Sequence, residues 1–416
     1  MTSSLRPWSG FEWWMLSNVA TGAATASFLN LLVPPFITSV TGSASRVGVV
    51  FAMLSLAAAI GPWVGRLAER TGRYRALYFV ALAAMGASFV VLAIGAQTWR
   101  WTPLFGVMLG AAYAAQGTLG PAFIVGSGDD DERVATRLTA FMLAYPVGQM
   151  LGAIVVAVGL AAGASTAAMF WIAAGCLTVL TALSWPATAA PARRLAEADA
   201  TPADAPTPRG DLDEGRAGAS PSLSTMVWSA FGAFLFAVAA SSLGSNGLTS
   251  QIANVMPSVY GVSGVQTSLL VGLAGLANIG VIVWAGRQLA TAGSLRIIRI
   301  GTAVRASGAL AMALLGLLSD AKLLLPALAM LVAFQGIPIA RIAAPPLATA
   351  LAPVPAAEAN GYYFASSALG AVAGCLAAGF LAEHVGYNAV NWMAAAGSGL
   401  ALMALGRITT SAVSRS

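Results

Sequence analysis

The chain contains a series of apolar stretches, each about 20 residues long, separated by short polar breaks. About 20 apolar residues in a helix cross the roughly 30 Å hydrocarbon core of a bilayer, and a helix satisfies its own backbone hydrogen bonds there. The pattern predicts twelve spans, over residues 12–35, 46–68, 75–96, 101–125, 135–161, 166–186, 225–252, 264–285, 296–318, 322–344, 358–381 and 387–406. We therefore expect an all-α integral membrane protein embedded in a lipid bilayer.

A polar segment divides these spans into two sets of six. We predict one six-helix bundle over 1–186, a linker over 187–224 and a second bundle over 225–416. The linker is rich in Ala, Pro, Asp and Arg and lacks apolar periodicity, so we expect it to be solvated and disordered on the cytoplasmic side. We expect the first span to be retained as a helix and not removed as a signal peptide.

The two halves resemble each other at a shift of about 221 residues. Because each half has an even number of spans, the halves are expected to be parallel repeats that enclose a central cavity. Glycines four residues apart in the fifth and eleventh spans predict close helix packing. The matched positions are Gly65-Arg66 with Gly286-Arg287, Gln116-Gly117 with Gln335-Gly336, and Gly148 and Gly152 with Gly370 and Gly374.

Composition narrows the class of protein further. Of 416 residues 58% are hydrophobic and 9% are charged, and the mean hydropathy is +0.79, which excludes a water-soluble enzyme. The net charge of +6 comes from arginines between apolar spans, so no nucleic-acid partner is expected. Both cysteines lie in apolar stretches, and no convergent acid–base or metal-binding set is found. We expect no enzymatic activity, no cofactor and no metal.

The basic residues also predict the orientation, because Lys and Arg in short loops resist translocation. With a cytoplasmic N-terminus, only Arg46, Arg100 and Lys322 fall on the outer side. Both termini are therefore expected in the cytoplasm, and the protein is expected in the cell (cytoplasmic or inner) membrane as a monomer.

The loop between the second and third spans carries a specific motif, which runs from Gly65 through Glu69 to Arg75. Its carboxylate could meet a helix N-terminus of the other half and so latch one conformation. The motif resembles the loop signature of the major facilitator superfamily, although Glu69 stands where aspartate is more usual and the second copy lacks the acid. The resemblance implies a twelve-helix fold that works by rocker-switch alternating access, with a conformational latch at Gly65, Glu69, Arg70, Gly72 and Arg73.

Two arginines, Arg305 and Arg341, lie inside spans, where a charge is costly and marks a functional candidate. Arg305 is close enough to the cytoplasmic edge for its side chain to snorkel, which we expect. Arg341 is in the tenth span, and the resemblance places spans one, four, seven and ten around the cavity. It is our candidate substrate-binding charge, for a carboxylate or phosphate, with an ion pair to Glu358 as the structural alternative.

Uncharged polar residues in the spans complete the candidate binding site. In the first and eleventh spans they recur at i, i+3 and i+7, which places them on one helix face. The alternative is hydrogen bonding between helices, which uses the same residue types. The candidates are Asn18, Thr21, Thr25, Tyr113, Gln116, Tyr145, Gln149, Asn246, Gln335 and Tyr363.

No carboxylate lies in the middle of a span. Proton coupling would then depend on Glu12 or Glu358, at span ends, as the candidate coupling groups. The acidic run over 129–132 is predicted to cap the fifth helix.

These observations predict a secondary active transporter of a small organic solute, with an organic anion as the expected class. Alternatives are an exporter of neutral sugar-like or amphiphilic, drug-like solutes, and a sensor with this fold that binds its ligand without moving it.

Overall fold

The computed structural model describes residues 10–125, 130–200, 228–318, 323–354 and 356–408. Within these ranges, twelve helical segments are long and apolar enough to cross a membrane, which confirms the predicted number. In the first half the elements are η1 (Trp13–Met15), α1 (Leu16–Gly22), η2 (Ala23–Phe28), α2 (Leu29–Thr41), α3 (Ala44–Ala58), α4 (Gly61–Thr71), α5 (Tyr74–Ile94), η3 (Trp99–Trp101), α6 (Thr102–Val125), α7 (Asp131–Ala161) and α8 (Thr166–Ala187).

The second half repeats this arrangement with fewer interruptions. The helix α9 (Ala189–Ala200) follows the first half. The second half consists of α11 (Ala230–Tyr260), α12 (Gly264–Ala292), α13 (Ser294–Leu315), α14 (Leu324–Leu351), α15 (Ala356–His384) and α16 (Asn388–Gly406). The elements η1 to α2 form the first span, and α3 with α4 forms the second.

Side-chain caps fix where several helices begin. Asp130 accepts a hydrogen bond from the backbone N–H of Arg133 at 2.9 Å, which satisfies one of the free donors at the start of α7. This confirms the predicted acidic cap, while Asp129 lies outside the described residues. Ser263 and Gln266 form a reciprocal capping box at the start of α12.

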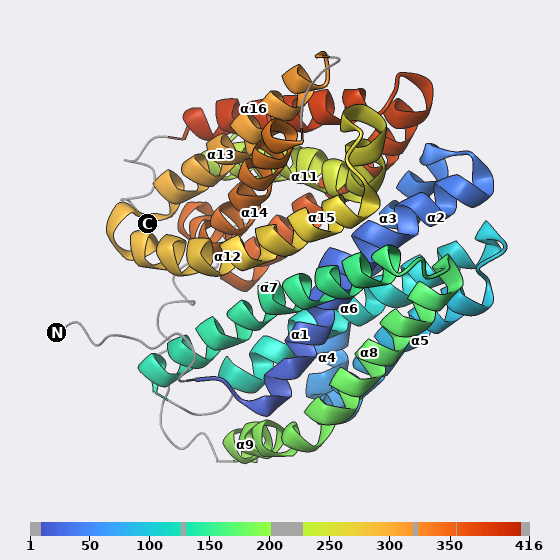
Figure 1. Cartoon of the computed structure of the whole chain (residues 1–416). Helices are drawn as coiled ribbons and strands as arrows, with labels where there is room; N and C mark the ends of the chain where they lie inside the picture. The colour runs from blue at the N-terminus through green and yellow to red at the C-terminus, as the bar shows by residue number, and fades with distance from the viewer. Residues whose placement is uncertain (1–9, 126–129, 201–227, 319–322, 355, 409–416) are drawn as a thin grey trace.

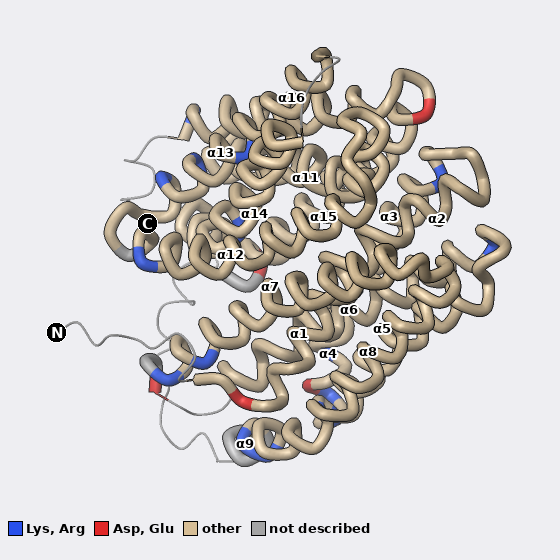
Figure 2. Tube along the Cα trace, viewed as in Figure 1, with Lys and Arg blue, Asp and Glu red and all other residues tan. Residues whose placement is uncertain are grey.

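The two ends of the helical bundle differ in charge. We call the end of the bundle where α4, α8 and α16 finish, toward the left of Figure 1, the terminal end. Figure 2 shows that Lys and Arg gather toward this end, with few at the opposite end. The distribution agrees with the asymmetry seen in the sequence.

Glycines bring the same two helices into contact in each half. A Cβ on Gly148 of α7 would overlap the carbonyl oxygen of Val19 in α1, and a Cβ on Gly370 of α15 would overlap that of Ala239 in α11. The first and fifth spans, and equally the seventh and eleventh, therefore pack backbone against backbone. This confirms the close packing that the repeated glycines predict.

The two halves meet along α3 with α15 and along α7 with α12. At the opposite end the contact is polar, since Gln251 donates to the Ala44 carbonyl at 3.2 Å and Asn254 donates to Thr38 Oγ1 at 2.9 Å. At the terminal end α4 packs mainly on α6 and α5 of its own half, and Trp63 on α4 is 63% exposed. The halves are thus closed at the opposite end and separated at the terminal end.

The expectation that the whole linker is disordered was wrong for its first part. Residues 189–200 form α9, which packs against the ends of α5, α6 and α8. Alanine has the highest helix propensity, and Leu195 is buried beside Phe123 and Phe141 in a cluster at this end of the bundle. Residues 201–224 lie outside the described part of the chain.

Candidate functional site

A cavity of about 550 Å³, counting its open mouth, lies among the helices of the second half. Its walls are mostly small and polar, and two arginines contribute to them. The residues that carry its chemistry are Ser241, Ser242, Ser245, Asn246, Arg305, Arg341, Tyr363 and Ser367. Such a mixture of cations, hydroxyls and amides suits a small polar solute and offers little to a purely apolar one.

Arg341 is the more exposed of the two cations in this cavity. It lies ten residues before Leu351, the last residue of α14, which places it about 15 Å from the terminal end of the helix. Its side chain is nevertheless exposed, because it faces the cavity. No carboxylate in the described ranges forms an ion pair with it, so the proposed pair with Glu358 is absent.

Three tyrosines surround the Arg341 guanidinium. Tyr113 of α6, Tyr145 of α7 and Tyr363 of α15 all lie near it. Two of these rings come from the first half and one from the second, so Arg341 lies near the boundary between the two repeats. A hydroxyl group can donate to a bound anion while the arginine supplies the charge.

A segment of π-helix sets the position of Thr25 in the first span. The hydroxyl groups of Thr25 and Tyr145 are 2.9 Å apart, which links this span to one of the tyrosines near Arg341. Thr21, by contrast, is fully buried and donates to the Ser17 carbonyl at 2.9 Å. The wider turn of η2 rotates the helix between Thr21 and Thr25, so the face expected from regular α-helical spacing is not continuous.

Asn18 and Gln116 form a network behind the tyrosines. Gln116 donates to Asn18 Oδ1 at 3.3 Å and to the Tyr78 hydroxyl at 3.4 Å, and Asn18 donates to the Phe141 carbonyl at 2.6 Å. All these side chains are buried, with Tyr78 completely enclosed. These hydrogen bonds hold α1, α5, α6 and α7 together. Asn18 and Gln116 thus have the role that was the alternative to solute binding, namely hydrogen bonding between helices. The sequence had given no reason to select Tyr78.

Gln149 and Gln335 each donate a hydrogen bond to a backbone carbonyl of α12 and so join it to a neighbouring helix. Gln149 of α7 donates to the Val271 carbonyl at 3.1 Å and accepts from Asn278 at 3.4 Å, which joins the two halves. Gln335 of α14 donates to the Ala274 carbonyl at 3.3 Å. Asn246 does line the cavity and also donates to the Ser242 carbonyl of its own helix at 3.0 Å.

The expectation that Arg305 snorkels toward the membrane surface was wrong. Its side chain turns into the second half, where Nε donates to Ser398 Oγ at 3.0 Å and Nη2 donates to Ser241 Oγ at 2.6 Å. The residue is only 4% exposed and still contributes to the cavity wall. The hydroxyl groups of Ser241 on α11 and Ser398 on α16 lie closer to the guanidinium than the membrane–water interface does. The sequence does not show that these two serines lie next to Arg305.

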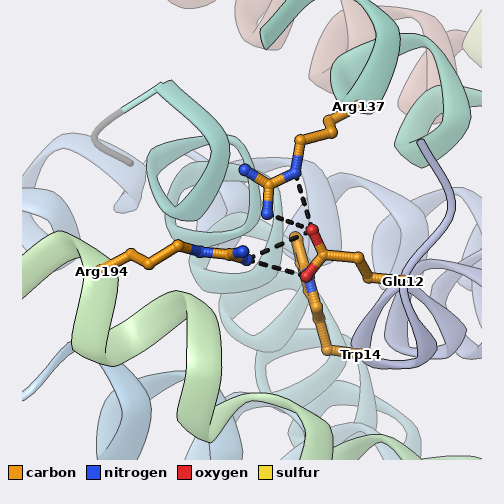
Figure 3. Close-up of polar contacts among 4 residues, drawn as sticks. All are labelled: Glu12, Trp14, Arg137 and Arg194. Atoms are coloured by element: carbon orange, nitrogen blue, oxygen red, sulfur yellow. Dashed lines mark hydrogen bonds and ion pairs between the residues drawn. The ribbon is translucent and has the colours of Figure 1, made fainter. Parts of the chain in front are cut away.

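Glu12 lies in an ion-pair cluster at the terminal end, apart from the cavity (Figure 3). It accepts from Arg137 of α7, with Nε at 2.7 Å, and from Arg194 of α9, with Nη2 at 2.8 Å. Trp14 Nε1 also donates to it at 3.1 Å. Burial opposes ionisation of Glu12, but the hydrogen bonds and charges of the two arginines outweigh it and lower its pKa.

The candidate latch residues and Glu358 lie at the terminal end as well. Gly65 lies on α4 close to Thr118 of α6, and Gly72 ends α4 with a φ of +63°, a conformation that favours glycine. Glu69, Arg70 and Arg73 are exposed, and no ion pair within the described ranges joins them to the second half. Glu358 is exposed near the start of α15 and interacts with Tyr362.

The family profile described as Major Facilitator Superfamily matches residues 15–357. This match covers most of both six-helix halves. The chain belongs to that superfamily. It is therefore a multi-pass membrane protein and a transporter of the solute-transport kind, and members of this superfamily are in general not enzymes. A search of curated protein sequences finds no match.

Solved structures of this superfamily share the fold along nearly the whole chain. The crystal structure of the nucleoside transporter NupG is 14% identical, with a TM-score of 0.69, and the match covers 95% of this chain and 99% of that one. A D-xylose–proton symporter is 15% identical, with a TM-score of 0.68 over 96% and 97%. The human organic anion transporter MFSD10 (TETRAN) is 15% identical, with a TM-score of 0.61 over 97% and 99%. At these identities the likeness concerns the fold alone.

Proposed function

We propose that this transporter moves a small organic anion, which binds at Arg341, by alternating access. The observation that carries the proposal is an exposed guanidinium inside a membrane span, with tyrosines around it and no carboxylate partner among the described residues. A charge at this depth is expensive unless it is compensated. A carboxylate or phosphate on the solute would compensate it with a charge-assisted, bidentate hydrogen bond.

The separation of the halves supports a rocker-switch mechanism. Here α4 packs mainly on its own half at the terminal end, while the opposite end is closed by contacts such as that between Asn254 and Thr38. With the arginine-rich terminal end in the cytoplasm, as its charge predicts, this conformation faces inward. Rotation of one half against the other would open the opposite end and close the terminal end, where Glu69 would then act as the latch.

The decisive experiment is solute flux in proteoliposomes. We expect Arg341→Gln to abolish anion flux and Arg341→Lys to restore only part of it, because lysine keeps the charge and loses the planar fork. Arg287→Gln is the matched control, since Arg287 is exposed and does not line the cavity. Flux with and without a pH gradient would identify proton coupling, for which Glu12 and Glu358 remain the candidates.

A neutral, sugar-like solute is the second candidate, and the hydroxyls and amide of Ser242, Ser245 and Asn246 in the cavity wall favour it. It predicts labelled-sugar flux that survives Arg341→Gln. Binding of a solute without any flux would instead support a sensor. Size-exclusion chromatography with light scattering would test the expected monomer.

A further inference from the structure

Arg305 is a buried charge that the protein itself leaves uncompensated. It lies in the middle of α13 and is 4% exposed, and its two hydrogen-bond partners, Ser398 and Ser241, are neutral hydroxyls. No carboxylate within the described ranges pairs with it. Because desolvation of a guanidinium is costly, a cation held in this way requires compensation from another source.

One side of the Arg305 guanidinium remains available to a solute. Nε and Nη2 donate to the two serines, whereas Nη1 has no hydrogen-bond partner among the described residues. Nη1 is also not among the fully enclosed unpaired atoms of the structure, and Arg305 contributes to the cavity wall. The free N–H groups of Arg305 therefore reach the same space as the guanidinium of Arg341.

The tight contact of α13 with α14 fixes the backbone positions of the two arginines relative to each other. A Cβ on Gly336 of α14 would lie 2.6 Å from the Cβ and backbone nitrogen of Arg305, so the two residues are at the same level. Arg341 follows Gly336 by five residues on α14, about 7.5 Å along the helix axis. Since both residues also line the same cavity, the two cations can each hold one end of a short molecule.

We propose that Arg305 is a second anion-binding subsite, and that the solute is a small organic dianion of the dicarboxylate type, with Arg341 holding one anionic group and Arg305 the other. This rests on the proposed function, because Arg341 supplies the first contact. The serines on α11 and α16 orient the Arg305 fork, so its free edge is presented to the cavity at little cost in side-chain entropy. A dianion would compensate both charges within the membrane spans, whereas a monoanion would leave one without a partner.

Matched pairs of mono- and dianions test this subsite. Flux of labelled succinate and butanoate, and of phthalate and benzoate, is measured in proteoliposomes with the wild-type protein, Arg305→Gln and Arg305→Lys. We expect the wild type to prefer each dianion. Loss of a charge-assisted hydrogen bond predicts that Arg305→Gln lowers dianion kcat/KM by about tenfold to a hundredfold and leaves monoanion kcat/KM nearly unchanged. Arg305→Lys should restore part of the preference.

Ser307→Ala on the same helix is the control, since Ser307 is exposed and bonds within its own helix. Equal losses of mono- and dianion flux in Arg305→Gln would make Arg305 a structural tie between helices and overturn the subsite. Flux that needs Arg341 but does not distinguish the members of each pair would overturn the subsite and leave the proposed function intact. Absence of flux for every anion with the wild type would overturn both.

Arg305→Gln could also fail to fold, which fluorescence-detected size-exclusion chromatography would reveal. Thermal stabilisation of the wild-type protein then provides the test, with succinate and butanoate compared at equal concentration and ionic strength. A larger stabilisation by succinate supports the subsite, because a ligand that binds the native state more tightly raises its apparent stability more. Equal stabilisation would overturn it.

Discussion

Ser43 and Glu383 join the two halves at the end of the molecule where they are closed. Ser43 Oγ donates to a Glu383 carboxylate oxygen at 2.5 Å, and the backbone N–H of Ser45 donates to the same oxygen at 2.8 Å. Glu383 thus adds a second acceptor at the start of α3 from a helix 340 residues further along the chain. The carboxylate stabilises the positive end of α3, and it does so only while this end remains closed.

Glu383→Ala should therefore favour opening of this end. The native Cys375 can report it, because it is 1% exposed and lies where α15 approaches Gly48 of α3. In a Cys176→Ser background, we expect a small thiol reagent to modify Cys375 several times faster in Glu383→Ala than in the parent protein. His384→Ala is the control, since His384 bonds only within its own helix. Equal rates in both variants would show that Glu383 does not hold the halves together.

Glu69 should influence the opening and closing of the terminal end. It is exposed and has no ion-pair partner within the described ranges, so Glu69→Gln removes nothing from the conformation described here. If its carboxylate latches the state in which the terminal end is closed, the variant should occupy that state less. We expect faster labelling of a cysteine introduced at Ser245 from the terminal side, measured against Arg287→Gln, which changes an exposed residue outside the proposed latch. An unchanged labelling rate would contradict the latch.

Gly148→Ala should destabilise the first half. Its Cβ would overlap the Val19 carbonyl oxygen, which is backbone and cannot rotate away. Overpacking of this kind costs about 1–3 kcal/mol or more, so we expect a clearly lower apparent melting temperature and poor expression. Gly175→Ala on α8 is the control, because a Cβ there meets nothing within 4 Å. Equal stability of the two variants would show that α1 and α7 can separate at small cost.

Ionisation of Glu12 should make part of the free energy of unfolding depend on pH. Because its folded-state pKa is lowered below the ordinary value of 4.5, its ion pairs stabilise the protein fully above that pH. The contribution is lost as the pH falls through the lowered pKa. We expect Glu12→Gln to cost about 1–3 kcal/mol at pH 7, the usual range for hydrogen bonds to charged groups.

Thermal unfolding in detergent from pH 7 to pH 3.5 measures this effect. The difference in melting temperature between wild type and Glu12→Gln should shrink below pH 4.5. Glu69→Gln serves as the control for removal of an exposed carboxylate and should give a small difference at every pH. A Glu12→Gln difference that stays constant with pH would mean that the cluster contributes through packing and not through charge.

Much of the fold was predictable because the bilayer imposes a length on each apolar helix. The hydropathy pattern found all twelve spans but underestimated the polar helix ends, as in the seventh, predicted to end at residue 252 and observed to end at Tyr260. Helix α9 was missed because its stability depends on contacts of Leu195 and Arg194 with residues distant in sequence. Propensity and periodicity describe a helix alone and contain nothing about these partners.

The candidate site was predictable only in part. The costs of charge in a membrane identified Arg341, and helical spacing identified Tyr363, both of which line the cavity. The same reasoning misplaced Arg305, because the distance to the membrane edge can be counted along a helix whereas serine partners on other helices cannot. Gln116 and Gln149 were predicted as solute-binding candidates, and the structure places both in hydrogen bonds between helices. Whether such a residue binds solute or a neighbouring helix depends on the packing.

Both cavity arginines belong to the second half, and the internal repeat gives neither of them a counterpart. At the shift of 219 that relates Gln116 to Gln335, Arg341 corresponds to Ala122. At the shift of 221 that relates Arg75 to Arg296, Arg305 corresponds to Ala84. An anion held by these arginines would therefore stay bound to the second half during the transport cycle. The first half, which contributes only uncharged tyrosine hydroxyls near Arg341, would rotate relative to the bound anion.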